Sequence, residues 1–306
     1  MRFEFDGVAQ RFQYRILMPS LVHGVAELTE RMGVARFLSN YFEGVDEKMV
    51  QLNFGIVNVM ALSGTAFVLF YYCGRLGFSK WESLVGAFLY LTSFFVVNYF
   101  SITLVDSLSC FFLMTGFYAV VGRSPGGLFL SLIFGALSKE TIFVLVLVVL
   151  ISERKLCSRM LIVCVLAVIL YGLYIVFFPI KTVDDGVYIF SVIFNPQTIQ
   201  KSLSTFLQFF NLYSVLEYIE VFSFLWVLFI YALLKCRMPL FLTRTAWLLL
   251  LPVLMTPLQS VGANGRVTFY LFPIVIPCAL YALGNILSSQ EGTFQKTEVA
   301  YPAENF

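Results

Sequence analysis

The chain has 306 residues, of which 59% are hydrophobic and only 12% are charged. A soluble domain averages about 25% charged residues, so this composition predicts an all-helical integral membrane protein. The net charge of +2 is too small to indicate a nucleic-acid partner. One histidine and six scattered cysteines offer no metal-binding pattern. We therefore expect no cofactor, and the sequence does not support a divalent metal.

The first 48 residues are the most polar part of the chain and hold no apolar run of spanning length. Between Leu21 and Arg31 the apolar residues fall on one helical face and the charged residues on the other. Such a helix is expected to lie on the membrane surface rather than to cross the bilayer. Residues 1–48 are thus predicted to form an outer-face loop with an amphipathic surface helix.

Apolar runs then predict a transmembrane domain over residues 49–287. The predicted full spans lie at 49–73, 82–100, 104–121, 159–179, 219–235, 244–258 and 267–287. Residues 180–218 are predicted to be an outer loop. The polar residues 288–306 are predicted to be a disordered tail.

The central stretch 126–151 joins two apolar runs through an adjacent Lys139–Glu140 pair. One straight helix over these residues would be about 39 Å long at about 1.5 Å per residue. That length exceeds the roughly 30 Å hydrocarbon core and places both charges near its middle. Two half-helices, 126–137 and 141–152, would instead place the charges at a turn. Ser138 would then cap the second half-helix, with Glu140 in its first turn.

The distribution of Lys and Arg favours the hairpin of half-helices (126–152). Only with a hairpin do the basic loops at 75–80, 154–159 and 235–244 share one face, which the positive-inside rule makes cytoplasmic. The fold is then about seven full spans plus the hairpin, in the inner membrane, with a cytoplasmic C-terminus. Residues 180–218 are predicted to lie over a polar cleft at the outer face as a lid. The seven residues predicted to line this cleft are Asp6, Arg11, Arg15, Asp106, Lys139, Glu140 and Arg266.

Four short motifs accompany this cleft. They are an Asp-bearing stretch before Gln13-Tyr14-Arg15, Val105-Asp106-Ser107-Leu108, the run from Gly135 to Thr141 that contains Lys139-Glu140, and Gly265-Arg266 before a Pro-containing final span. Together these motifs resemble bacterial membrane glycosyltransferases of the GT-C superfamily, and the resemblance covers most of the chain. Members of that superfamily carry a spanning helix before the acidic loop. None precedes Asp6 here, so we expect either that the sequence is truncated or that its start codon is placed too far downstream.

The resemblance implies transfer of a sugar, with inversion, from a polyprenyl-phosphate carrier to a glycan, lipid or protein acceptor at the periplasmic face. The family's general base matches Asp6, and Asp106 is a second catalytic candidate. A hydroxyl nucleophile needs a carboxylate within hydrogen-bond reach, and a phosphate leaving group needs cations. The candidate residues for binding the donor or its phosphate are Arg11, Arg15, Lys139, Glu140 and Arg266.

Each candidate also has a structural interpretation. Asp6 is also consistent with a solvated tail residue, and Asp106 with a carboxylate that only favours the positive end of its helix. Arg15 and Arg266 suit interfacial anchoring as well, and the Lys139–Glu140 pair suits helix packing. At the level of function, a transporter or flippase, a glycan polymerase or ligase, and a non-catalytic membrane subunit stay open as alternatives.

Overall fold

The computed structural model describes residues 16–34, 45–101, 106–152, 159–177, 212–250 and 264–290. Within these ranges every regular element is a helix, which confirms the all-helical prediction for this part of the chain. The helices are α2 (Leu17–Arg31), α4 (Val45–Arg75), α5 (Lys80–Leu91), α6 (Phe94–Ser101), α7 (Asp106–Val121), α8 (Pro125–Ser138), η1 (Glu140–Phe143), α9 (Val144–Ser152), α10 (Arg159–Phe177), α13 (Leu212–Phe222), α14 (Leu225–Lys235), α15 (Leu240–Thr245), η2 (Ala246–Leu249), α17 (Asn264–Phe269) and α18 (Phe272–Gln290).

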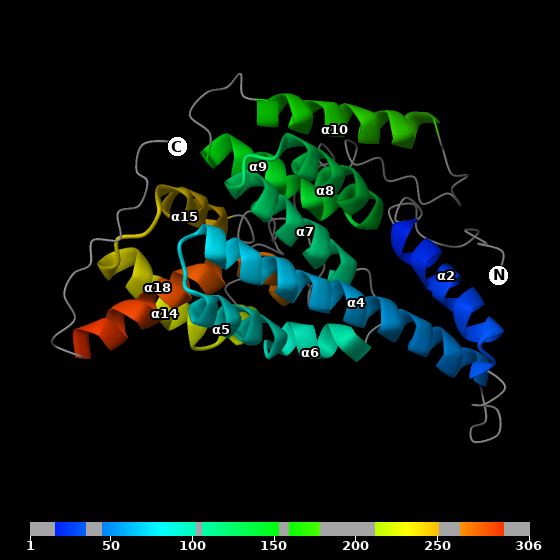
Figure 1. The fold of residues 1–306 in the computed structure, drawn as a ribbon, viewed down its shortest axis with the longest axis horizontal. Coiled ribbons are helices and arrows are strands. Elements are labelled where there is room, and N and C mark those ends of the chain that lie inside the picture. The colour runs from blue at the N-terminus through cyan, green and yellow to red at the C-terminus, as the bar shows by residue number, and fades with distance from the viewer. Residues whose placement is uncertain are drawn as a thin grey trace.

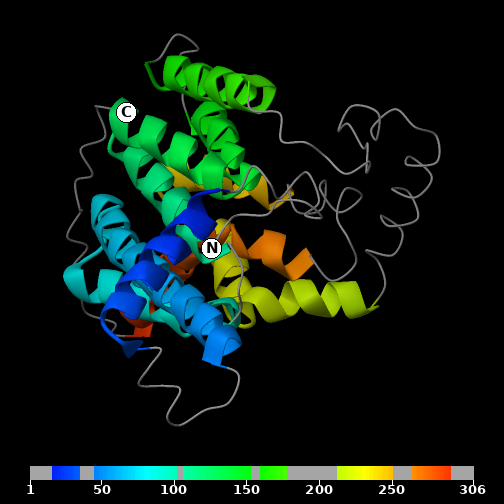
Figure 2. The same cartoon turned by 90° about the vertical axis from the view of Figure 1, so that its right-hand side faces the viewer.

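Helices α4 and α7 form the centre of the molecule (Figure 1). On α7, the side chains of Leu113, Met114 and Phe117 are fully buried, because α4 and α8 both pack against it. Helix α2 packs against α4, with Met18 and Val22 buried there. A second layer joins α18 to α14 and α5. Figure 2 shows α13 and α17 side by side at the edge of the bundle.

Two described helices are long and apolar enough to cross a membrane by themselves: α10 and the Met49–Arg75 part of α4. A third span results if α13 and α14, which meet at 81°, are one broken span. In α10 the apolar side chains of Val176 and Phe177 are 69% and 72% exposed. Exposure of such a helix to water would be unfavourable, so its outer face suits lipid.

The predicted count of seven full spans is not confirmed, because the described part holds two or three spans by length and composition, and two of the predicted runs are interrupted by bends. The run 82–100 divides into α5 and α6, where the hydroxyls of Thr92 and Ser93 donate to the backbone carbonyls of Phe88 and Tyr90. Such bonds compete with the helical ladder. The run 219–235 bends where Ser223 has a φ of +44°, which no helix continues through.

The central stretch is not one straight helix. Helix α8 ends at Ser138, Lys139 has an extended backbone, and η1 then leads into α9. Glu140 lies in the first turn of η1, as predicted. The predicted Ser138 cap is wrong: the capping position belongs to Lys139, whose side chain makes no capping bond. The reason is that Ser138 still belongs to α8, and a lysine ammonium has no acceptor for the backbone N–H groups of η1.

Close packing at a glycine holds this turn together. A Cβ built on Gly135 would lie 2.5 Å from Cγ1 of Ile142, whose side chain is buried. We expect Gly135→Ala to lower the thermal midpoint of the detergent-solubilised protein. Overpacking costs about 1–3 kcal/mol, whereas the gain in helix propensity is about 0.5–1 kcal/mol.

Gly172→Ala in α10 is the matched control, because nothing lies within 4 Å of a Cβ added there. Its midpoint should equal or exceed that of the wild type. A Gly135→Ala protein that melts no earlier than Gly172→Ala would contradict the packing argument.

Candidate functional site: a buried ion pair at three helix ends

Three polar side chains meet inside the bundle, and each comes from the end of a helix. Lys139 Nζ lies 2.5 Å from Oδ1 of Asp106, which is 33 residues away in the sequence. The Tyr270 hydroxyl donates to the same carboxylate oxygen at 2.9 Å. Asp106 begins α7, Lys139 separates α8 from η1, and Tyr270 separates α17 from α18.

The helix end suits the charge of Asp106, because a carboxylate is favoured at the positive N-terminal end of a helix. Lys139 lies between the negative end of α8 and the positive end of the short η1, so its charge depends chiefly on Asp106. Asp106 is 0% exposed and Lys139 is 8% exposed. A buried charge is costly unless it is paired and hydrogen-bonded, so each of these residues needs the other.

The ammonium group of Lys139 keeps capacity for a further acceptor. It has three N–H donors, and its one acceptor among the described residues is Asp106. Its other contact there is with the ring of Tyr270, whose centroid lies 5.1 Å from Nζ. An anionic ligand oxygen could therefore bind Lys139 without displacing Asp106.

A second polar pair fixes the start of α7 to α4. The Ser107 hydroxyl donates to Oδ1 of Asn58, and both side chains are buried. Because Ser107 directly follows Asp106, this bond fixes the backbone that carries the carboxylate. The position of Asp106 is thus fixed by its sequence neighbour Ser107 and by two partners in space, Lys139 and Tyr270.

The structure places the predicted site residues unequally. It brings Asp106 and Lys139 into contact. Glu140 is exposed, in contrast to the buried Lys139. The backbone of Arg266 lies in α17, the helix that leads to Tyr270, but its side chain lies outside the described part. Three of the candidates also lie outside the described residues: Asp6, Arg11 and Arg15.

Sequence reasoning missed Tyr270, Asn58 and Ser107. An asparagine within an apolar spanning run is a usable signal, since such a side chain needs a partner in the membrane. Tyr270 carried no such signal, because it is one of 16 tyrosines in a chain that also has 34 phenylalanines.

Comparison of the chain with models of known protein families, with curated proteins and with solved structures finds no match. The fold and the site define a helical protein with helices of membrane-spanning length and a buried, hydrogen-bonded ion pair where helices end. The chemistry of that ion pair and the sequence motifs are therefore the basis for inferring a function.

Proposed function

We propose that the protein is an integral-membrane glycosyltransferase that moves a sugar from a polyprenyl-phosphate donor to an acceptor hydroxyl. The observation that carries the proposal is the Asp106–Lys139 pair, since it joins two of the sequence motifs in one buried site. Ionisable residues at membrane depth are costly and typically mark a functional site.

In the proposed reaction the acceptor oxygen attacks the anomeric carbon on the face opposite the carrier phosphate. Asp6 takes the hydroxyl proton as the new C–O bond forms. The bond from the anomeric carbon to the phosphate oxygen breaks, and its electron pair stays on the phosphate. Lys139, with Arg11, Arg15 and Arg266, would stabilise that charge. Asp106 would hold the Lys139 ammonium in place, and the exposed Glu140 would accept bonds from sugar hydroxyls.

The positions of the basic residues support a periplasmic site in the inner membrane. Helix α7 begins at Asp106, and Tyr118 near its other end lies under the guanidinium of Arg75, 4.0 Å from the ring centroid. At that same far end, Phe117 packs on Phe241. Arg244 lies three residues from Phe241 and donates to the carbonyl of Ser152. Cations gather on the cytoplasmic side of membrane proteins, so the ion pair would face the periplasm.

A transporter of lipid-linked glycans is the second candidate. It is favoured by the discontinuous helices, namely the 81° bend between α13 and α14 and the break at Lys139. Transporters use such breaks to place helix ends and charges near the bilayer midplane. Both candidates bind a lipid-linked phosphate, and they differ in whether the sugar leaves its carrier.

The test uses a radiolabelled polyprenyl-phosphate sugar and protein in nanodiscs. The wild type is expected to bind this donor and to transfer its sugar to an added acceptor. The paired variant Asp106→Asn/Lys139→Met leaves no uncompensated charge, and we expect its donor affinity to fall about tenfold to a hundredfold. A bond to a charged group contributes about 1.5–3 kcal/mol.

Lys235→Met is the control, because it removes an exposed cation from the last turn of α14. Donor affinity should be unchanged in this variant. Equal donor affinity in the wild type and the paired variant would contradict a phosphate site at Lys139. Binding without transfer would favour the transporter.

A further inference from the structure

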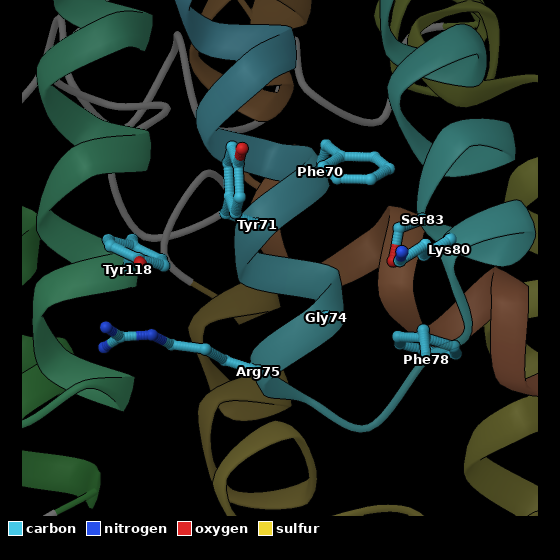
Figure 3. Close-up of a pocket in the computed structure, with 8 residues that line it drawn as sticks. All are labelled: Phe70, Tyr71, Gly74, Arg75, Phe78, Lys80, Ser83 and Tyr118. Atoms are coloured by element: carbon cyan, nitrogen blue, oxygen red, sulfur yellow. The ribbon is translucent and has the colours of Figure 1, made fainter.

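A second polar site lies at the end of α4 that is remote from the ion pair. Here a pocket of about 360 Å³ is lined by eight residues: Phe70, Tyr71, Gly74, Arg75, Phe78, Lys80, Ser83 and Tyr118. Figure 3 shows Arg75 extending beside Tyr118 on one side of α4, with Lys80 and Ser83 on the other side. Gly74 lies between them, and nothing lies within 4 Å of a Cβ added to it.

The pocket carries a positive charge that no acidic residue in its lining balances. Arg75 and Lys80 are exposed, the lining holds no acid, and neither residue has an ion pair among the described residues. The acid adjacent in sequence, Glu82, is engaged elsewhere, since its carboxylate accepts from the backbone N–H of Ser79 at 2.7 Å. The pocket therefore attracts an anion.

A buried hydroxyl adds a directional group to the pocket. Ser83 is 1% exposed, and its Oγ has no hydrogen-bond partner within the described part of the chain. Buried polar groups in proteins nearly always have a partner, so an unpartnered one in a pocket wall indicates a missing ligand atom. A phosphate on the Lys80 side of α4 would accept from Ser83 and Lys80, while Arg75 adds positive charge from the other side of the helix.

The position of the pocket indicates where this phosphate comes from. Asn58 marks the level of Asp106 through its bond with Ser107, and Arg75 lies about 25 Å further along α4 at about 1.5 Å per residue. The hydrocarbon core of a bilayer is roughly 30 Å thick. With the ion pair near one boundary, the pocket lies near the other. Exposed apolar side chains flank it, among them Phe67 and Trp81.

We propose that this pocket binds the phosphate headgroup of an anionic phospholipid. The aromatic residues Phe70, Tyr71 and Phe78 border the acyl region, Lys80 and Ser83 bind the phosphate, and Arg75 attracts it from the other side of α4. The site is independent of the transfer reaction and requires only that the chain lies in a bilayer. Zwitterionic lipid binds less well, because its choline group is repelled by the two cations.

The test is native mass spectrometry of the detergent-purified protein titrated with phosphatidylglycerol or phosphatidylcholine. Phosphatidylglycerol is expected to bind the more tightly of the two. Its affinity should fall about tenfold or more in Arg75→Gln/Lys80→Gln, and about twofold to tenfold in Ser83→Ala. Gly74→Phe, which fills the open space, should also weaken binding even if the double variant folds poorly.

The control Lys235→Gln/Arg237→Gln removes two exposed cations from the same end of the bundle. Both flank Cys236, whose thiol contacts the Tyr281 carbonyl. Phosphatidylglycerol affinity should be unchanged in it. An equal loss in the control, equal binding of phosphatidylcholine, or unchanged binding in both Ser83→Ala and Gly74→Phe would overturn the proposal. Displacement of the lipid by excess inorganic phosphate alone would assign the pocket to free phosphate instead.

Discussion

Removal of one charge from the buried ion pair is expected to destabilise the protein by about 3–5 kcal/mol. Asp106→Asn leaves the Lys139 ammonium without an anionic partner, and Lys139→Met leaves the Asp106 carboxylate without a cation. Both side chains are almost completely buried, so water cannot replace the lost partner. Tyr270 reduces the loss of stability in Lys139→Met, because its hydroxyl still donates to Asp106.

Removal of both charges together should cost much less than the sum of the two single losses. In Asp106→Asn/Lys139→Met no uncompensated charge remains, and the side chains keep similar volumes. The measurement is a double-mutant cycle on the unfolding of the detergent-solubilised protein, followed by tryptophan fluorescence. Because each single loss is about 3–5 kcal/mol, we expect a coupling of about 3 kcal/mol or more, at or above the upper end of the usual range for residues in contact. Additive losses would mean that the two residues do not form a pair in the membrane.

This cycle also separates a structural role from a functional one. If the pair only joins helices α7 and α8, the folded double variant should bind and process lipid-linked sugar as the wild type does. If Lys139 binds the carrier phosphate, the double variant should be stable yet inactive. In that case stability is lost mainly in the single variants, whereas the double variant is stable but has lost donor affinity.

The ion pair was partly predictable because charges within apolar runs are conspicuous. Lys139 interrupts an apolar stretch too long for one span, so the sequence predicts a break there. The sequence also places Asp106 at the start of a helix and on the same face of the membrane. It does not specify that Asp106, rather than Glu140, is the partner of Lys139. That choice depends on how α7 packs against α8, which local patterns do not encode.

The number of spans was less predictable, because hydropathy reports how apolar a segment is and not whether its helix bends. The runs 82–100 and 219–235 are apolar throughout much of their length. The bends coincide with the hydroxyl bonds of Thr92 and Ser93 and with the positive φ of Ser223. Serine and threonine are common inside membrane helices without such effects, since their side chains also bond within a straight helix. Tertiary packing decides between the two outcomes.

Substitution of Asp6 by asparagine is expected to abolish sugar transfer while leaving the amount of folded membrane protein unchanged. Asparagine has nearly the same shape as aspartate but cannot accept the acceptor's proton. Loss of a general base typically costs about 10²–10⁴-fold in rate. The measurement is the initial rate of transfer from a labelled polyprenyl-phosphate sugar, using protein expressed from a reading frame examined for an upstream helix.

Glu4→Gln is the matched control, because it neutralises another carboxylate in the same N-terminal segment. It should transfer sugar at the wild-type rate, and Asp6→Asn should still bind the donor, since the cations proposed to bind the phosphate are intact. An unchanged rate in Asp6→Asn would remove Asp6 as the base and leave the buried Asp106 as the remaining acidic candidate. Asp106 is a weaker candidate, because its carboxylate already accepts from Lys139 and Tyr270. An absence of transfer in the wild type, with donor still bound at Lys139, would instead make the ion pair part of a transporter or of a non-catalytic subunit.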